Sequence, residues 1–188
     1  FEFGSGKFTI LSPQNISKES NANSVAIRLT NGENSFIFTG DADYNSEADM
    51  VSSGIDLSCD VLSVGHHGSA TSTSWDFLQA TVPEYAVISC GAGNMYGHPH
   101  EETMEKLSDM GIQVYRTDEQ GTIVVSSAGN SLSWNMDPCN DYTSGDGTSP
   151  AGESEKQGFA GEQYDDQGES NDTDSKEADS AQNSTENM

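Results

Sequence analysis

The sequence predicts an α/β fold in which helices cover a sheet. Two apolar runs, DVLSVG (60–65) and YAVISC (85–90), have the composition of buried strands. Each run is followed by a segment typical of a helix, STSWDFLQAT (72–81) and HPHEETMEKLSDMG (98–111). Buried strands that alternate with helices favour a sheet with helices packed on it.

Strand patterns also precede the first of these runs. FTILSP (8–13) is a short apolar run ended by proline, and SVAIRLT (24–30) and SFIFTG (35–40) are rich in β-forming residues. The Asn31-Gly32 pair between the last two predicts a hairpin. A helix is expected from about Asn45 to Gly54, with Ala48 and Val51 on one face.

Between residues 72 and 136, the sequence predicts two helices and three short strands beside the strand YAVISC. A Ser or Thr should cap the helix within 72–81. In the helix of 98–111, Pro99 is expected near the first turn and Gly111 at the C-terminal end, with one apolar face formed by Met104, Leu107 and Met110. The closing strands are IQVYRT, GTIVVSS and SLSWNM.

Composition divides the chain in two. Its 188 residues carry a net charge of −24, and mean hydropathy is −0.62. Residues 1–136 hold 17 acidic and 5 basic side chains, whereas the shorter segment 137–188 holds 14 acidic and 2 basic ones and almost no aliphatic residue. Such a segment cannot bury enough apolar surface to offset its ordering entropy. We therefore predict a folded domain over 1–135 and a disordered acidic tail over 136–188.

The start of the chain and its cysteines give weaker information. The chain begins with Phe1, without a basic and apolar leader or a run of about 18 apolar residues. Our interpretation is that its natural start is missing. The cysteines have no CxxC spacing; Cys90 is expected in the core, and Cys59 and Cys139 are expected to be more exposed.

Polar side chains that can bind metal follow the predicted strands. His66 and His67 come directly after one strand, Asp41 follows the strand FIFTG, and His98 opens a helix. A carboxylate and an imidazole at the ends of adjacent strands suit zinc or manganese. The simpler alternatives are that Asp41 caps a helix and that the histidines are ordinary surface groups.

Several ordered motifs then point to a family. FIFTGDAD, DVLSVGHHGSATSTS, NMYGHPHEETMEKL and GIQVYRTDEQGTIVV together resemble the metallo-β-lactamase fold. Within it, the sequence is similar to the extracellular domain of ComEC-type DNA-internalisation competence proteins. The resemblance implies an αββα sandwich and a hydrolase that uses two divalent metal ions, zinc or manganese.

The resemblance also implies the metal ligands. Asp41 matches the aspartate that bridges the two metals, and it would take part in catalysis. His66 or His67 matches the histidine that binds the second metal. We favour His66 because it leaves the strand first, with its neighbour orienting the loop.

Three further residues match positions that face the substrate. Ser69 could bond a phosphate oxygen, and Asn94 and His98 would lie at the mouth of the site. There they would contact a phosphate, and His98 would protonate a leaving group as a catalytic residue. Arg116, in the YRTD element, is interpreted as a structural ion-pair partner.

One part of the family pattern is absent. The chain has no HxHxDH motif, which supplies most ligands of the first metal, and no histidine before Asp41. We therefore interpret the chain as the second, C-terminal half of the fold. We expect it to bind zinc or manganese weakly and to hydrolyse nothing measurable by itself, whereas the intact parent should be active.

The function that follows is a fragment of a metal-dependent phosphodiester hydrolase of the competence-nuclease type, acting on nucleic acid during DNA uptake. The low count of basic residues weighs partly against nucleic acid. A smaller phosphoester, such as a choline phosphate, is the alternative substrate. A non-catalytic, surface-exposed binding module with a degenerate fold is the alternative from another class. We expect an extracellular or cell-surface location, and a membrane-anchored parent is compatible with it.

Overall fold

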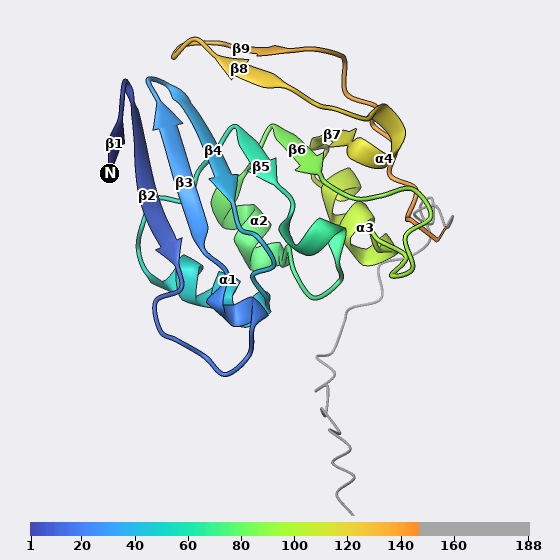
Figure 1. Cartoon of the computed structure of the whole chain (residues 1–188), viewed down its shortest axis with the longest axis horizontal. Helices are drawn as coiled ribbons and strands as arrows, with labels where there is room; N and C mark the ends of the chain where they lie inside the picture. The colour runs from blue at the N-terminus through green and yellow to red at the C-terminus, as the bar shows by residue number, and fades with distance from the viewer. Residues whose placement is uncertain (147–188) are drawn as a thin grey trace, which may run out of the picture. The chain divides into compact units, whose positions relative to one another are not determined.

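The structure is a computed structural model, and it describes residues 1–146 (Figure 1). The remainder of the predicted tail, 147–188, lies outside the described residues. The strands are β1 (Glu2–Phe3), β2 (Gly6–Ser12), β3 (Ala26–Asn31), β4 (Asn34–Phe38), β5 (Val61–Ser63), β6 (Tyr85–Ile88), β7 (Gln113–Arg116), β8 (Val125–Ser127) and β9 (Leu132–Trp134). The helices are α1 (Tyr44–Ser52), α2 (Trp75–Thr81), α3 (Glu101–Asp109) and α4 (Thr117–Gln120), with short 3-10 turns η1 (Asn21–Asn23) and η2 (Gly65–Gly68).

The first seven strands form one mixed sheet in sequence order, β1 to β7. Strands β1 to β4 pair antiparallel, and β4 to β7 pair parallel. The change of direction falls at β4, whose parallel neighbour β5 is reached through α1. This arrangement confirms the predicted mixed α/β fold and the hairpin at Asn31-Gly32, whereas the αββα sandwich stays a prediction.

Helices α1, α2 and α3 cover one face of the sheet, where the apolar core lies (Figure 1). Alternate residues of each strand point to this face, because successive side chains of a strand lie on opposite sides. Ile37, Leu62, Ala86 and Val114 are paired across four strands at one level and are fully buried. The helices contribute Met50, Phe77, Leu78, Met104 and Leu107.

The β8–β9 hairpin crosses the opposite face of the sheet at one end (Figure 1). Its Trp134 ring stacks on Tyr115 at 4.1 Å between centroids and lies 5.2 Å from the Tyr85 ring. At its tip, the Gly129 carbonyl accepts a hydrogen bond from Glu33 N. The hairpin is therefore held at both ends by the sheet that it covers.

Gly32 is required for this contact, and its replacement gives a stability prediction. It has a φ of +61°, and a Cβ added there would lie 2.3 Å from the Gly129 carbonyl oxygen. Left-handed backbone costs a non-glycine residue about 1–2 kcal/mol, and the clash adds to that. We expect Gly32→Ala to lower the free energy of unfolding by at least about 2 kcal/mol. Urea unfolding measures this, with Gly54→Ala as the control, since φ is also positive there but no atom lies within 4 Å of the added Cβ.

The predicted helices are confirmed, with corrections in detail. Ser74 caps α2 through a bond from Phe77 N, and Gly111 follows α3 with a φ of +66°. Pro99 does not lie in the first turn of α3, because His100 is the N-cap. In α1 the expected face was wrong. Ala48 and Val51 are exposed, and the buried residues are Ser46, Glu47 and Met50.

Two further expectations are corrected by burial and contacts. Cys59 was expected to be exposed, but it is buried in the core because it ends the loop that enters β5. The domain also continues past the predicted boundary at 135. Asn140 Oδ1 accepts a hydrogen bond from Val114 N at 3.0 Å, and Tyr142 donates to the Ile112 carbonyl at 2.8 Å. The segment 137–146 therefore packs against β7 as part of the domain.

Among residues 1–146, no helix has the length and apolar character needed to cross a membrane.

Candidate functional site

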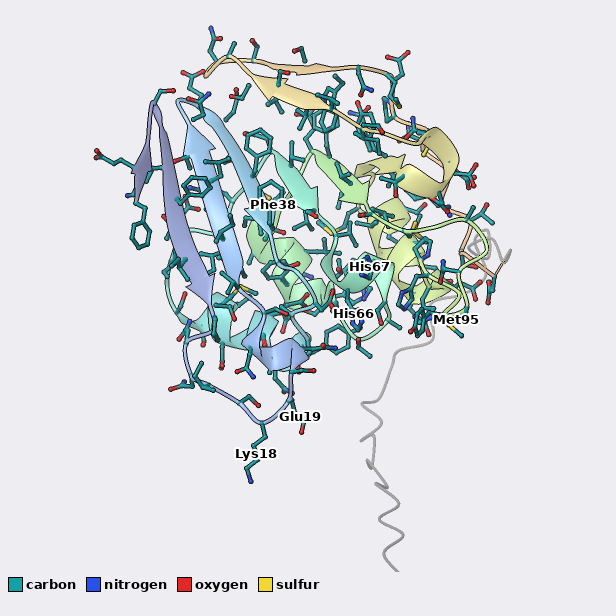
Figure 2. The ribbon with its side chains drawn as sticks, viewed as in Figure 1. Lys18, Glu19, Phe38, His66, His67 and Met95 are labelled. Carbon is teal, nitrogen blue, oxygen red and sulfur yellow. The ribbon has the colours of Figure 1, made fainter. Side chains whose placement is uncertain are left out.

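The candidate site lies where the parallel strands β4, β5 and β6 end. The loops that follow these strands carry Asp41, His66, His67 and His98, in that order. Carboxyl ends of neighbouring parallel strands meet at one edge of a sheet, where ligands commonly bind in open α/β folds. Figure 2 shows His66 and His67 beyond the end of β5, with Met95 on the loop to their right.

The turn that carries the two histidines is strained. His66 and His67 have φ values of 48° and 58°, in the left-handed region that non-glycine residues rarely adopt. Such positions cost of order 1–3 kcal/mol each and concentrate at functional sites. The turn also requires glycine at its end, because a Cβ on Gly68 would lie 2.5 Å from Pro99. His66 N also donates to the Gly40 carbonyl at 2.9 Å, which ties the turn to the loop after β4.

Asp41 and His67 face each other in this site. His67 Nε2 lies 3.8 Å from Asp41 Oδ1, and both side chains are about half exposed. His67 Nδ1 is 2.7 Å from the Ser89 carbonyl oxygen, which can only accept, so Nδ1 carries the proton. The Nε2 lone pair of the neutral ring is therefore directed to the side of the carboxylate. A histidine fixed in this way by a backbone carbonyl is typical of a metal ligand.

Asp41 does not have the simpler role of a helix cap. The N-cap of α1 is Asp43, whose Oδ1 accepts a hydrogen bond from Ser46 N at 2.9 Å. Asp41 lies in the loop before α1, and its carboxylate faces His67. That alternative is therefore removed by the structure.

Two other imidazoles adjoin the Asp41–His67 pair. The His66 and His98 rings lie 5.6 Å apart, and the His67 and His98 rings lie 6.3 Å apart. His66 Nδ1 is within 3.3 Å of Thr71 Oγ1. Burial, and then the neighbouring histidines, lower the pKa of His98, which favours its neutral form. The structure thus places the His66, His67 and His98 rings near one another and His67 next to Asp41, whereas the choice of metal ligand stays a prediction.

These donors fit part of a metal centre. Within residues 1–146, no three His, Cys, Asp or Glu side chains are placed so that they could hold one ion together. Structural zinc sites take four ligands and catalytic ones take three with a water. Asp41 and His67 supply two donors of the right chemistry. The described residues therefore offer an incomplete donor set, and metal binding by this chain stays a prediction.

Ser69 and Asn94 were predicted to contact substrate, and the structure gives both side chains internal partners. Ser69 is buried, and its Oγ lies 3.0 Å from Thr71 Oγ1. Asn94 Oδ1 accepts from the backbone N–H groups of Tyr96 and His98, at 3.1 and 3.0 Å. These contacts indicate that both residues stabilise the loops of the site. Their contact with substrate remains a prediction.

Arg116 was interpreted as a structural ion-pair partner, and this is confirmed. Its guanidinium is buried and bonds both carboxylate oxygens of Asp118, at 2.7 and 3.1 Å. It also donates to the carbonyl oxygens of Asp141 and Thr143. The segment that it holds ends at Gly145, whose N–H donates to the Pro99 carbonyl next to His98. Arg116 thus stabilises the segment that packs against Pro99, next to His98, and is not itself part of the site.

The comparisons with known proteins point to competence proteins. No protein-family model matches the chain. It is 39% identical over 118 residues to ComE operon protein 3 of Bacillus subtilis, and the matched region covers 62% of this chain and 15% of that protein. It is 41% identical over 106 residues to competence protein ComA of Neisseria gonorrhoeae, with 56% and 15% covered.

A third relative shows the same coverage. Recombination protein 2 of Haemophilus influenzae is 38% identical over 120 residues, with 63% of this chain and 15% of the relative covered. The chain therefore spans about 15% of the length of each of these curated relatives. The predicted similarity to competence proteins is supported, and it concerns one part of much longer proteins. The metallo-β-lactamase fold stays a prediction.

Sequence reasoning missed two residues that shape the site. Glu47 is fully buried and accepts hydrogen bonds from Thr73 N and Ser74 N, at 2.5 and 2.7 Å. Burial raises its pKa, although these bonds and nearby Lys106 act in the opposite direction. It fixes the loop that presents Thr71 to His66. An acidic residue in a helix predicts a solvated face, so no sequence signal could have found it.

His100 is the second residue; it was visible among the histidines at a helix start, and what sequence reasoning missed is its role in joining two loops. Its Nδ1 accepts from Ala70 N at 2.9 Å, and its Nε2 donates to the Tyr96 carbonyl at 3.0 Å. Both ring nitrogens are therefore engaged, and His100 ties the loop after η2 to the loop before α3. Its place beside His98 at a helix start does not predict these two contacts, because both partners belong to loops that only the folded chain brings near it.

The two sets of contacts predict opposite tautomers. We expect neutral His67 to carry its proton on Nδ1 and neutral His100 to carry it on Nε2, because each bonds a backbone carbonyl through that nitrogen. Long-range ¹H–¹⁵N correlation spectra above about pH 8, where imidazoles are neutral, distinguish the two forms. A Nε2–H tautomer for His67 would contradict the site geometry described above.

Proposed function

We propose that this chain forms part of a metal-dependent hydrolase that cuts phosphodiester bonds during DNA uptake. The observation that carries the proposal is the placement of His67 Nε2, 3.8 Å from Asp41 Oδ1, at the carboxyl ends of the parallel strands. The similarity to a protein named for competence supports the link to DNA uptake. The strain at His66 and His67 supports a role beyond stability.

In this proposal Asp41 and His67 hold a divalent ion, zinc or manganese. Such an ion polarises a phosphoryl oxygen and lowers the pKa of bound water. Because two donors do not complete a metal centre, the remaining ligands would come from polypeptide outside the described residues 1–146. The length of the relatives, of which this chain matches about 15%, leaves room for such a segment.

The chain's own residues would position these groups. The Ser89 carbonyl holds the His67 ring, and the Gly40 carbonyl holds the turn in its left-handed course. His98 lies next to the pair and would contact a phosphate oxygen, whereas its lowered pKa disfavours the protonated imidazole that a leaving-group acid needs. We also propose a cell-surface location for the domain, in a membrane-anchored parent.

The test compares the complete gene product with the 188-residue chain. With manganese, the complete protein should hydrolyse bis(p-nitrophenyl) phosphate, and the 188-residue chain should give no measurable turnover. Robust turnover by the chain alone would contradict the incomplete-centre interpretation. An inert complete protein would favour the non-catalytic binding module.

A further inference from the structure

The loop between β6 and α3 holds an aromatic side chain that no step so far has used. Tyr96 is 70% exposed, and its neighbour Met95 is 88% exposed at the edge of the molecule (Figure 2). The Tyr96 ring lies nearly parallel to His98, with centroids 5.6 Å apart and an interplanar angle of 22°. One face of the Tyr96 ring thus covers a candidate catalytic histidine.

This exposed aromatic residue is held firmly in place. Its N–H donates to Asn94 Oδ1 at 3.1 Å, and its carbonyl accepts from His100 Nε2 at 3.0 Å. Asn94 and His100 are themselves fixed to other parts of the site, through the His98 carbonyl and Ala70 N. The backbone that carries the ring is therefore fixed, and a Tyr side chain, which has two χ angles, loses little conformational entropy when it binds a ligand.

The ring borders a cavity that reaches the candidate metal ligand. This cavity of about 340 Å³ is lined by Tyr96, His98 and His67, and by the backbone of Gly91. Its size falls in the range of small-molecule sites, about 300–1,000 Å³. A ligand that fills it would touch the aromatic ring at one end and approach His67 at the other.

The charge of the cavity limits what could bind. Its lining contains no Lys or Arg, and residues 1–136 carry 17 acidic against 5 basic side chains. Affinity for a nucleic acid could therefore not come mainly from phosphate contacts, which need basic groups. Stacking of bases on aromatic side chains is the other common source of affinity for single strands.

We propose that Tyr96 is a base-stacking platform that binds the nucleobase next to the phosphate that the ion proposed at Asp41 and His67 would hold. This inference rests on the proposed function. It assigns single-stranded nucleic acid as the substrate class, bound through the stacking of one base. Tyr96 is a specificity-determining residue in this account. Binding should depend little on salt, because few phosphate contacts contribute.

The test measures binding by the 188-residue chain, and it needs no catalysis. The probes are a thymidine tetranucleotide and a tetramer of the same charge with abasic positions. Binding is followed by NMR through the Met95 methyl group. We expect the abasic probe to bind about tenfold more weakly, and Tyr96→Leu to weaken the tetranucleotide by a similar factor, since stacking supplies this much per base. Tyr96→Phe keeps the ring and should stay within about twofold of the wild type.

Each alternative outcome is decisive. Equal binding of the two probes, no binding of either, or a Tyr96→Leu variant that matches the wild type would overturn the proposal. An unchanged amide spectrum away from the loop shows that the variants fold. A base-selective chain whose complete parent hydrolyses nothing would refute the proposed function and leave the platform standing. An active complete protein with a chain that does not prefer bases would refute the platform and leave the proposed function standing.

Discussion

Asp41→Asn should lower the manganese-dependent phosphodiesterase activity of the complete protein by more than about 100-fold. Loss of a group that merely supports a metal ligand costs about 10–100-fold in metal affinity or activity, so the loss of a ligand should cost more. An asparagine has the same shape but no negative charge for a divalent ion. His67→Gln should have a comparable effect, because it removes the Nε2 lone pair. Initial rates with bis(p-nitrophenyl) phosphate measure both.

The matched control is Asp43→Asn. Asp43 is two residues away and caps α1, a task that asparagine performs equally well. Its activity should equal that of the wild type. If Asp41→Asn and Asp43→Asn behaved alike, the carboxylate of Asp41 would have no special role.

Asp118→Ala should be the most damaging change to stability, at about 3–5 kcal/mol of unfolding free energy. The ion pair with Arg116 is almost entirely buried, with side-chain exposures of 3% and 6%. Removal of the carboxylate leaves the guanidinium buried with only carbonyl partners and the more distant Asp141. The segment before Gly145, which lies behind His98, should loosen at the same time. Urea unfolding, with hydrogen exchange of Thr143 N–H as a local probe, checks both effects.

A second Arg–Asp pair in the same protein is the control. Arg28 and Asp56 are 3.2 Å apart, but Asp56 is 69% exposed. Exposed pairs contribute about 0–1 kcal/mol, so Asp56→Ala should hardly change stability. Similar losses for both variants would mean that burial of the Arg116 pair has no energetic consequence.

The same pair predicts a dependence on pH. Burial opposes the charge of Asp118, but its hydrogen bonds to Arg116 outweigh burial and lower its pKa below the usual 3.8. A lowered pKa stabilises the fold above the unfolded value, and that stabilisation is lost as pH falls through the folded value. The free energy of unfolding should therefore drop below about pH 3.8. In Asp118→Ala this part of the acid loss should disappear.

Sequence patterns predicted the elements of the fold because local chemistry decides them. The apolar runs before Gly65 and Cys90 form β5 and β6, and the predicted hairpin forms with Gly32 and Glu33 in its turn. Positions that depend on tertiary packing were less predictable. The prediction of which face of α1 is buried was wrong. Glu47 is buried by Thr73 and Ser74, just before α2, and by Lys106 of α3, and these residues are distant in sequence.

The candidate site shows the same division. Strand ends followed by Gly and a polar residue placed Asp41 and the paired histidines correctly at one edge of the sheet. The sequence could not predict which of the paired histidines faces Asp41, because the orientation of His67 depends on the Ser89 carbonyl, which lies at another strand end. Residues 137–146 lack aliphatic side chains and so resembled the tail. They pack through Tyr142 and backbone bonds instead.

The most direct test of the central claim is titration of the 188-residue chain with Mn²⁺, observed through the imidazole signals of its four histidines. A paramagnetic ion broadens the nearest nuclei first. We predict that His67 broadens at the lowest Mn²⁺ concentration, ahead of His100, and that the effect is lost in Asp41→Asn. Carboxylates of the residues beyond 146 cannot imitate this result, since that segment contains no histidine. A His67 signal that stays sharp, or broadening that persists in Asp41→Asn, would contradict the account.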